Sequence, residues 1–169
     1  MSTSEALTRS VAAVRELFDA AACSCALATP DGSGLTFVAA DGAGAAEVLG
    51  VEVPVGRGLV GWAAMSGQPV AVRDVHSDAR FARDIAEGTG YVPTAVFAAP
   101  FFDDGGEVQG VLEVLDPRID VSGDWPLAVL GTLASQLSAI VSAGGASDAD
   151  RQYAVLGRRV TELVETQRG

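Results

Sequence analysis

Gly56, Gly58 and Gly61 have the spacing of a loop that binds the phosphates of a dinucleotide. In such enzymes the glycines allow a tight turn and let the backbone approach a pyrophosphate at the N-terminus of a helix. The context here differs, because the extended run before the loop contains Pro54, which cannot donate to the ladder of a central strand. The helix predicted at 58–66 is also too short to cross back over a parallel sheet. We therefore predict that these glycines form a tight turn and a closely packed short helix.

Cys23 and Cys25, the two cysteines of the chain, lie two residues apart in an apolar run. On a strand their side chains would point to the same face, at or beyond the usual distance for a disulfide. We interpret them as small core residues of a protein in reducing cytoplasm. Their spacing from His76, the single histidine, matches no usual zinc pattern, so no metal site is predicted.

The remaining residues give no support for nucleophilic catalysis. Asp74, His76 and Ser77 are too close in sequence for a side-chain relay, because neighbouring loop residues seldom face one another. All eleven basic residues are arginine, and the absence of lysine excludes Schiff-base chemistry. The sequence therefore predicts no catalytic residue, and we interpret His76 as a solvated loop residue.

Composition limits the class of protein. The chain has 169 residues, 49% of them hydrophobic, and a mean hydropathy of +0.30, which indicates one folded domain with a substantial core. A net charge of −11 disfavours direct binding to nucleic acid or to an anionic membrane. The first ten residues contain Glu5 and Arg9 and no apolar run, so no signal peptide is expected. The uncharged run from Trp125 to Ser147 contains polar residues and two glycines, and we predict a buried helix there rather than a membrane span.

Turn signals and periodicity predict the elements that hold these residues. Ser2 and Glu5 form a capping box for a helix near 4–20. Two hairpins are expected, 23–29 with 35–40 and 94–102 with 107–115, because Asp- and Gly-rich turns separate the paired runs. The segments expected between the hairpins are a helical turn at 45–49, an extended piece at 51–55, a helix at 58–66, a brief strand at 70–72, and a helix capped by Asp78 that holds Phe81 and Ile85.

The two ends of the chain carry apolar seams with helical spacing, which lead us to predict a homodimer formed through helices near 4–20 and 126–166. The predicted division is an N-terminal dimerisation helix at 1–22, a central domain at 23–143, and a hinge followed by a coiled-coil-like helix at 144–169. The seams consist of Leu7, Val11, Val14 and Phe18, then Leu130, Leu133, Leu137 and Ile140, and then Tyr153, Leu156, Val160 and Leu163.

Over about residues 25–142 the chain resembles GAF domains, small-molecule sensor modules related in architecture to PAS domains. The residues that carry the resemblance are Pro54 to Trp62, Gly67 to Val70, Asp74 to Phe81, Val96 to Pro100 and Gly110 to Val114. The resemblance implies an α+β fold with a central antiparallel sheet of five or six strands. It also implies short helices over one face of the sheet and N- and C-terminal helices packed on the other.

Several ligand classes of this family lack their residues here. Cyclic-nucleotide binders resemble Gly110–Leu115 but follow it with an Asn-Lys pair, where this chain has Asp116 and Pro117. The cysteines are in the wrong place for bilin attachment, and His76 is in a polar loop rather than placed as a haem ligand. No cofactor is predicted.

We therefore predict a cytoplasmic signalling sensor that binds a small, partly apolar ligand and relays binding through dimer helices, with an effector protein as a further partner. The acids Asp74, Asp78, Asp84 and Glu87 near the expected roof disfavour anionic ligands, with Arg73 and Arg80 expected to pair with Asp74 and Asp78. The alternatives are a ligand-free dimerisation module and a cysteine-dependent free methionine sulfoxide reductase.

The candidate ligand-binding residues are Trp62, Phe81, Ile85, Tyr91, Thr94, Phe97 and Glu113. For each aromatic side chain, ordinary core packing is the competing interpretation. Glu113 interrupts an apolar run, so it either faces solvent on a half-exposed sheet, which is the ordinary case, or is buried with a purpose.

Overall fold

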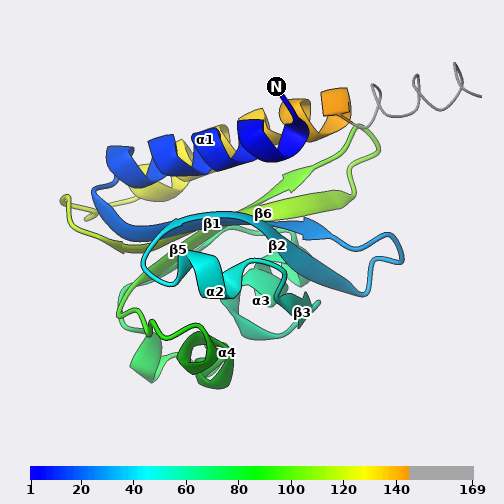
Figure 1. The fold of residues 1–169 in the computed structure, drawn as a ribbon. Helices are drawn as coiled ribbons and strands as arrows, with labels where there is room; N and C mark the ends of the chain where they lie inside the picture. The colour runs from blue at the N-terminus through cyan, green and yellow to red at the C-terminus, as the bar shows by residue number, and fades with distance from the viewer. Residues whose placement is uncertain (145–169) are drawn as a thin grey trace, which may run out of the picture.

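A six-stranded antiparallel sheet runs through the middle of residues 1–144, which are the residues that the computed structural model describes (Figure 1). The strand order is β3-β2-β1-β6-β5-β4, and every pair of neighbours is antiparallel. This confirms the predicted α+β class. The strands are β1 (Ala20–Ala28), β2 (Gly34–Gly42), β3 (Glu52–Pro54), β4 (Val70–Val72), β5 (Val96–Phe102) and β6 (Val108–Pro117).

Both predicted hairpins are present, β1 with β2 and β5 with β6. The pairing of β1 with β6 joins them, so the two hairpins form one sheet with β1 and β6 at its centre. β1 begins three residues before the predicted start, because the chain turns sharply at Asp19, whose φ is 45°, directly after the first helix.

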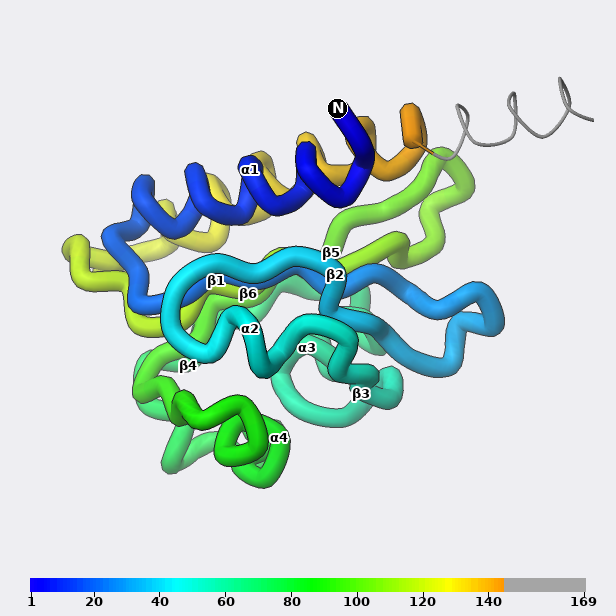
Figure 2. Tube along the Cα trace, in the orientation of Figure 1, coloured from blue at the N-terminus to red at the C-terminus, as the bar shows by residue number. Residues whose placement is uncertain are grey.

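Two long helices cover one face of the sheet, which we call the helix face (Figures 1 and 2). They are α1 (Thr3–Leu17), capped by Ser2 as predicted, and a helix from Trp125 to Gly144. The two run antiparallel: the rings of Phe18 and Trp125 stack 6.2 Å apart at one end, and a Cβ on Gly144 would collide with the Thr3 hydroxyl at the other. The predicted seams supply the buried contacts Leu7, Val11, Val14, Phe18, Leu130 and Leu137.

The helix Trp125–Gly144 is long and apolar enough to cross a membrane, by length and composition alone. Core helices of soluble proteins also have this length and composition. Our expectation of a buried helix is correct only for one side of it. Leu130, Ala134 and Leu137 enter the core, while only 17% of its most apolar 18-residue stretch is buried.

Short helices cover the opposite face, which we call the cavity face (Figure 1). The predicted helix at 58–66 is present, and its glycines act as expected: Gly56 and Gly58 have φ of 90° and 69°, and a Cβ on Gly61 would lie 2.6 Å from the Pro54 carbonyl oxygen. These helices are α2 (Ala45–Val48), α3 (Gly58–Ser66), α4 (Arg83–Gly88) and the 3₁₀ turn Val75–Ser77.

The predicted helix start at Asp78 is wrong. α4 begins at Arg83, with Ala82 as its N-cap, so Phe81 lies before the helix. Asp78 instead accepts hydrogen bonds from the backbone N–H and the guanidinium of Arg80. Because its carboxylate is bonded locally, it does not cap α4.

The proposed domain boundaries after residues 22 and 143 remain predictions. The C-terminal seam from Tyr153 to Leu163 and all of the proposed hinge segment beyond Gly144 lie outside the described residues.

Candidate functional site

A cavity of about 90 Å³ lies between the cavity face of the sheet and the segments that cover it. A single water needs roughly 10–15 Å³ of such space, so the cavity has room for several waters or a small organic molecule. Its floor comes from β1, β2 and β6, and its roof from the regions of α2, α3 and α4. The main floor residues are Ala22, Ser24, Ala40, Glu113 and Leu115, and the main roof residues are Val48, Leu59, Phe81, Ile85, Tyr91 and Pro93.

The space exists because one row across the sheet carries small side chains. Strand register aligns Ala40, Ser24, Glu113 and Ala98 on neighbouring strands, and Glu113 is the only long side chain among these four. Side chains opposite one another on adjacent strands lie about 4.5–5.5 Å apart, so Ser24 and Ala98 flank the acid directly. The floor is therefore a shallow apolar surface with one carboxyl group on it.

Glu113 is half-buried and borders the cavity, so it lies between the two expected cases of a solvent-facing and a fully buried acid. Removal from water raises its pKa to about 7, because the charged form loses hydration, while the hydroxyl of Ser24 acts in the opposite direction. A carboxyl group with this pKa changes its charge near neutral pH. It can both accept and donate a proton toward a molecule in the cavity.

Tyr91 closes one side of the cavity and is held there by Asp116. The phenol donates to the Asp116 carboxylate, which also accepts from the backbone N–H groups of Thr94 (2.9 Å) and Ala95 (2.8 Å). Asp116 has a φ of 51°, a left-handed conformation that Asp tolerates better than most residues. Desolvation, together with this hydrogen bond, raises the pKa of Tyr91 to about 12, so the phenol stays protonated. The acid that distinguishes this chain from cyclic-nucleotide binders thus anchors the loop beside the cavity.

Two ion pairs tie the rim to neighbouring elements. Asp41 of the cavity wall accepts from Arg15 of α1, with 3.1 Å between the Nη1 and Oδ2 atoms. Arg57, before α3, pairs with Asp84 of α4. The two pairs leave the wall without a free cation among the described residues that line it.

Four of the seven candidate ligand-binding residues line this cavity: Phe81, Ile85, Tyr91 and Glu113. The other three lie elsewhere. Trp62 is outside the lining, with the Arg80 guanidinium 4.5 Å above its ring, and Phe97 is in the core of the helix face. Thr94 is exposed, and its hydrogen bonds are made by its backbone: its N–H donates to Asp116 and its carbonyl oxygen accepts from the Val75 N–H.

Sequence reasoning missed Ser24, Asp41 and Arg57. Ser24 had a usable signal, since it lies between two cysteines that alternate onto the opposite face of the strand. Asp41 and Arg57 had none, because only the tertiary structure brings Asp41 of β2 and Arg57, just before α3, to one rim.

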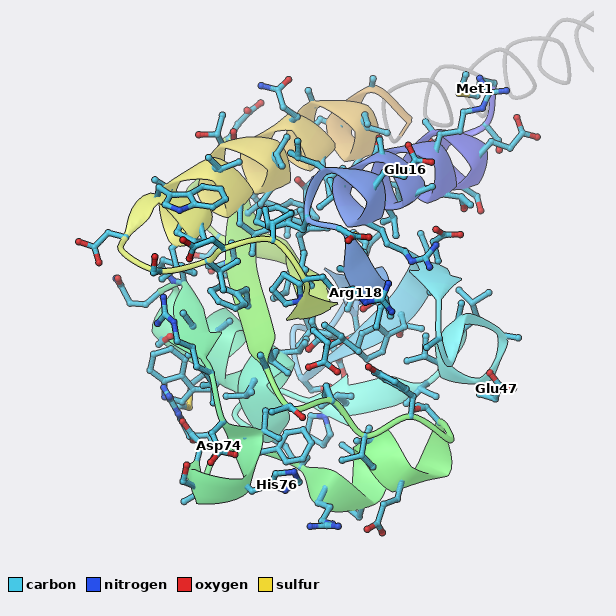
Figure 3. The ribbon with its side chains drawn as sticks, turned by 90° about the vertical axis from the view of Figure 1, so that its left-hand side faces the viewer. Met1, Glu16, Glu47, Asp74, His76 and Arg118 are labelled. Atoms are coloured by element: carbon cyan, nitrogen blue, oxygen red, sulfur yellow. The ribbon has the colours of Figure 1, made fainter. Side chains whose placement is uncertain are left out.

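The cysteines and the histidine lie in environments that match their interpretation as core and loop residues. Cys23 and Cys25 are buried, and desolvation raises the pKa of both thiols, that of Cys25 to about 12. His76 is exposed and, with Asp74, lies at the end of the molecule away from α1 (Figure 3). Among residues 1–144, no three His, Cys, Asp or Glu side chains are grouped so as to hold a metal ion.

The expected pairings of the roof arginines are half correct. Arg80 pairs with Asp78. Arg73 donates instead to the carbonyl oxygens of Val121 and Gly123, and its guanidinium lies 5.6 Å from the centre of the Phe97 ring.

Comparison with solved structures shows the same fold in other proteins. The GAF domain of an Acinetobacter phosphoenolpyruvate-protein phosphotransferase is similar at a TM-score of 0.74 and 21% identity, with 88% of this chain and 87% of that chain covered. A free methionine-R-sulfoxide reductase from Neisseria meningitidis, solved with its substrate, is similar at 0.71 and 22% identity, with 86% and 81% covered. At these identities the likeness concerns the fold.

Sequence comparison gives the family. A dual 3′,5′-cyclic-AMP and -GMP phosphodiesterase 11A from Takifugu rubripes is 33% identical over 66 residues, which are 39% of this chain and 7% of that protein. The match thus spans less than a tenth of that relative. GAF domains are in general regulatory modules and typically soluble, although some similar structures, the Neisseria reductase among them, are enzymes. The family model for GAF domains matches residues 2–141, and the chain belongs to the GAF domain family.

Proposed function

We propose that this GAF domain is a signalling sensor that binds a small, partly apolar molecule in the cavity over Ser24 and Glu113. The cavity itself carries the proposal, because its walls are mostly apolar and its polar groups are few and fixed in place, as in ligand sites of other proteins. GAF domains commonly have this role in signalling proteins such as phosphodiesterases. A cytoplasmic location fits the unpaired buried thiols of Cys23 and Cys25.

The structural effect of ligand binding would be transmitted to the end helices through Asp41 and Arg15. Asp41 belongs to the cavity wall, and Arg15 belongs to α1 on the other face of the sheet. The Arg15 Nε atom also donates to the carbonyl oxygens of Ala20 and Ala21, so a shift of β2 against β1 would change the contacts that hold the end of α1.

A homodimer through the helix face would receive that change. Leu17 and Trp125 expose 56% and 42% of their surfaces at neighbouring helix ends, and a second copy would cover them. Sedimentation at concentrations on the order of tens of micromolar tests this part, and a monomer there would remove the dimer relay. An effector protein would then bind differently to the ligand-free and ligand-bound arrangements of the helices.

The reductase alternative requires a reactive thiolate. Cys23 and Cys25 are 1% and 0% exposed, and burial holds both thiols in the protonated form. These environments count against cysteine chemistry and favour the sensor.

The test is a screen of small metabolites by thermal shift, with the unmodified protein and an Ala40→Leu variant compared. A bound ligand at 100 times its Kd adds about 2.7 kcal/mol of stability. The larger side chain of Ala40→Leu would fill the cavity floor, so the variant should not respond to a compound that stabilises the unmodified protein. Equal responses of the two proteins would place the ligand elsewhere and overturn the proposal.

An Arg15→Gln variant tests the relay separately. It should still bind the same ligand, because Arg15 is outside the cavity lining. Ligand-induced changes in hydrogen exchange along α1 should disappear in this variant, and their persistence would contradict a route through Asp41.

A further inference from the structure

The floor of the cavity holds one acid that has no cationic partner among the described residues around it. Glu113 projects from the middle of β6, between Ser24 on β1 and Ala98 on β5. Neither neighbour carries a charge, so neither can balance an ionised carboxylate.

The other ionisable groups of the wall are already engaged. Asp41 of β2 is paired with Arg15, and Arg57 before α3 is paired with Asp84. On β1 the Cys23 thiol is buried and protonated. The phenol of Tyr91 donates to Asp116, so its proton points toward that carboxylate. Any positive charge that faces Glu113 in the bound state would therefore come from the ligand.

We propose that the ligand of this cavity carries a protonated amine on a short aliphatic body, and that Glu113 is the counter-ion of the amine. This deepens the sensor function and rests on it. The apolar side chains of Leu59, Phe81 and Ile85 would cover the aliphatic part, and the ammonium group would reach the carboxylate on the floor. Ser24 would be the second polar contact, since it is beside Glu113 in the same row.

This arrangement makes binding depend on pH. An aliphatic amine stays protonated from pH 6 to pH 8, whereas Glu113 has a pKa of about 7 in the empty cavity. Only the ionised carboxylate attracts the cation, so the affinity should rise roughly tenfold from pH 6 to pH 8. Binding at pH 6 would release the proton that Glu113 holds.

The probes are three molecules of one shape: isobutylamine, isobutanol and isobutyrate. Calorimetric titration in phosphate at pH 6 and pH 8 compares them on the unmodified protein, and amide chemical shifts of Ser24 and Glu113 locate the site. The expected result is binding of isobutylamine, tighter at pH 8, with weaker binding of the alcohol and none of the carboxylate.

Two variants with the same change of charge complete the test. Glu113→Gln should lose affinity for isobutylamine on the order of tenfold or more, together with its pH dependence. Glu52→Gln, at an exposed position of β3 outside the cavity, should behave like the unmodified protein. If Glu113→Gln does not fold, the pH dependence of the unmodified protein still decides the matter.

The outcomes separate this proposal from the sensor function. Binding of isobutanol as tight as that of isobutylamine, or amine binding that ignores pH or survives Glu113→Gln, overturns the amine proposal and leaves the cavity as a ligand site. Failure of all three probes also overturns it, and the metabolite screen with Ala40→Leu then judges the sensor function independently.

Discussion

The helix face and the cavity face of the sheet are built from alternate residues of the same strands, and each has a buried apolar cluster, yet they differ in how they are covered. On β5 and β6 the helix face carries Phe97, Phe101 and Leu112, each exposed by 1% or less. One row of the cavity face carries Ala98 and Ser24 beside Glu113. Leu7, Val11, Leu130 and Leu137 of the long helices fill the space over the helix face, whereas the short helices leave a gap over this row of the cavity face.

The coverings differ in the same sense. α1 and the helix Trp125–Gly144 place several large residues in the core, and α3 on the cavity face also has buried residues, while α2 and α4 contain none. Few buried apolar contacts are typical of segments that open locally at low cost. The comparison therefore predicts that local opening, and any ligand-dependent motion, starts at α2 and α4 of the cavity face rather than at the long helices of the helix face.

The largest expected effect is on stability, and it comes from replacing leucine by alanine on each face of β6. Leu112→Ala removes a fully buried side chain and should lower the free energy of unfolding by about 2–5 kcal/mol, because it leaves a new void in a filled core. Leu115→Ala should cost clearly less, since Leu115 is partly exposed and already borders the cavity. Urea denaturation of both variants measures the difference. Equal losses would show that the two faces are packed alike.

The next prediction replaces two neighbouring alanines of β2, one on each face of the sheet, by the larger leucine. Ala39 is 1% exposed in the helix-face core, so Ala39→Leu should destabilise the protein by about 1–3 kcal/mol through overpacking. Ala40→Leu should cost less than about 1 kcal/mol, because the new side chain enters existing space. Thermal and urea unfolding give both values. A larger loss for Ala40→Leu than for Ala39→Leu would contradict the cavity.

The hairpins and the end helices could be predicted from sequence because their signals are local. Turn residues at 30–34 and 103–106 fix each hairpin, and the spacing of Leu7, Val11 and Val14 fixes the buried side of α1. Neighbouring residues carry that information, so no distant contact is needed to interpret it.

The cavity lining could be predicted only in part, for two physical reasons. β5 is buried on both faces, so nothing in its sequence separates Val96, near the cavity, from Phe97 in the helix-face core. α3 is apolar all round, so its spacing could not show that Trp62 lies outside the lining while Leu59 is inside it. The neighbours of Glu113 depend on the register of β1 with β6, which is a long-range property.

The third effect concerns pH and the charge on the cavity floor. The pKa of Glu113 is about 7 in the folded protein and 4.5 in an unfolded chain, so the folded state holds a proton that the unfolded state loses between these values. The contribution to stability is complete below pH 4.5 and is lost as the pH rises through 7. Glu113→Gln should therefore be more stable than the unmodified protein at pH 8, by on the order of 1–2 kcal/mol, and nearly equal to it near pH 4.

Urea denaturation at pH 4 and pH 8 checks the Glu113 prediction, with Glu52→Gln as the exposed control. The control should move little at either pH. A Glu113→Gln variant that is less stable than the unmodified protein at pH 8 would show that the carboxylate is stabilised by a partner.

The smallest expected effect tests how firmly Tyr91 closes the cavity. Tyr91→Phe keeps the ring in the wall and removes only the hydroxyl that donates to Asp116. The Asp116 carboxylate keeps its bonds to the Thr94 and Ala95 N–H groups, so the loss of stability should be about 0.5–1.5 kcal/mol. Hydrogen exchange should become faster in α4 and the loop up to Tyr91 while the amides of β5 and β6 keep their protection, because the released segment has few buried contacts. Faster exchange spread evenly over both faces of the sheet would show that Tyr91 supports the whole fold, and the contrast between a stable helix face and a mobile cavity face would then fail.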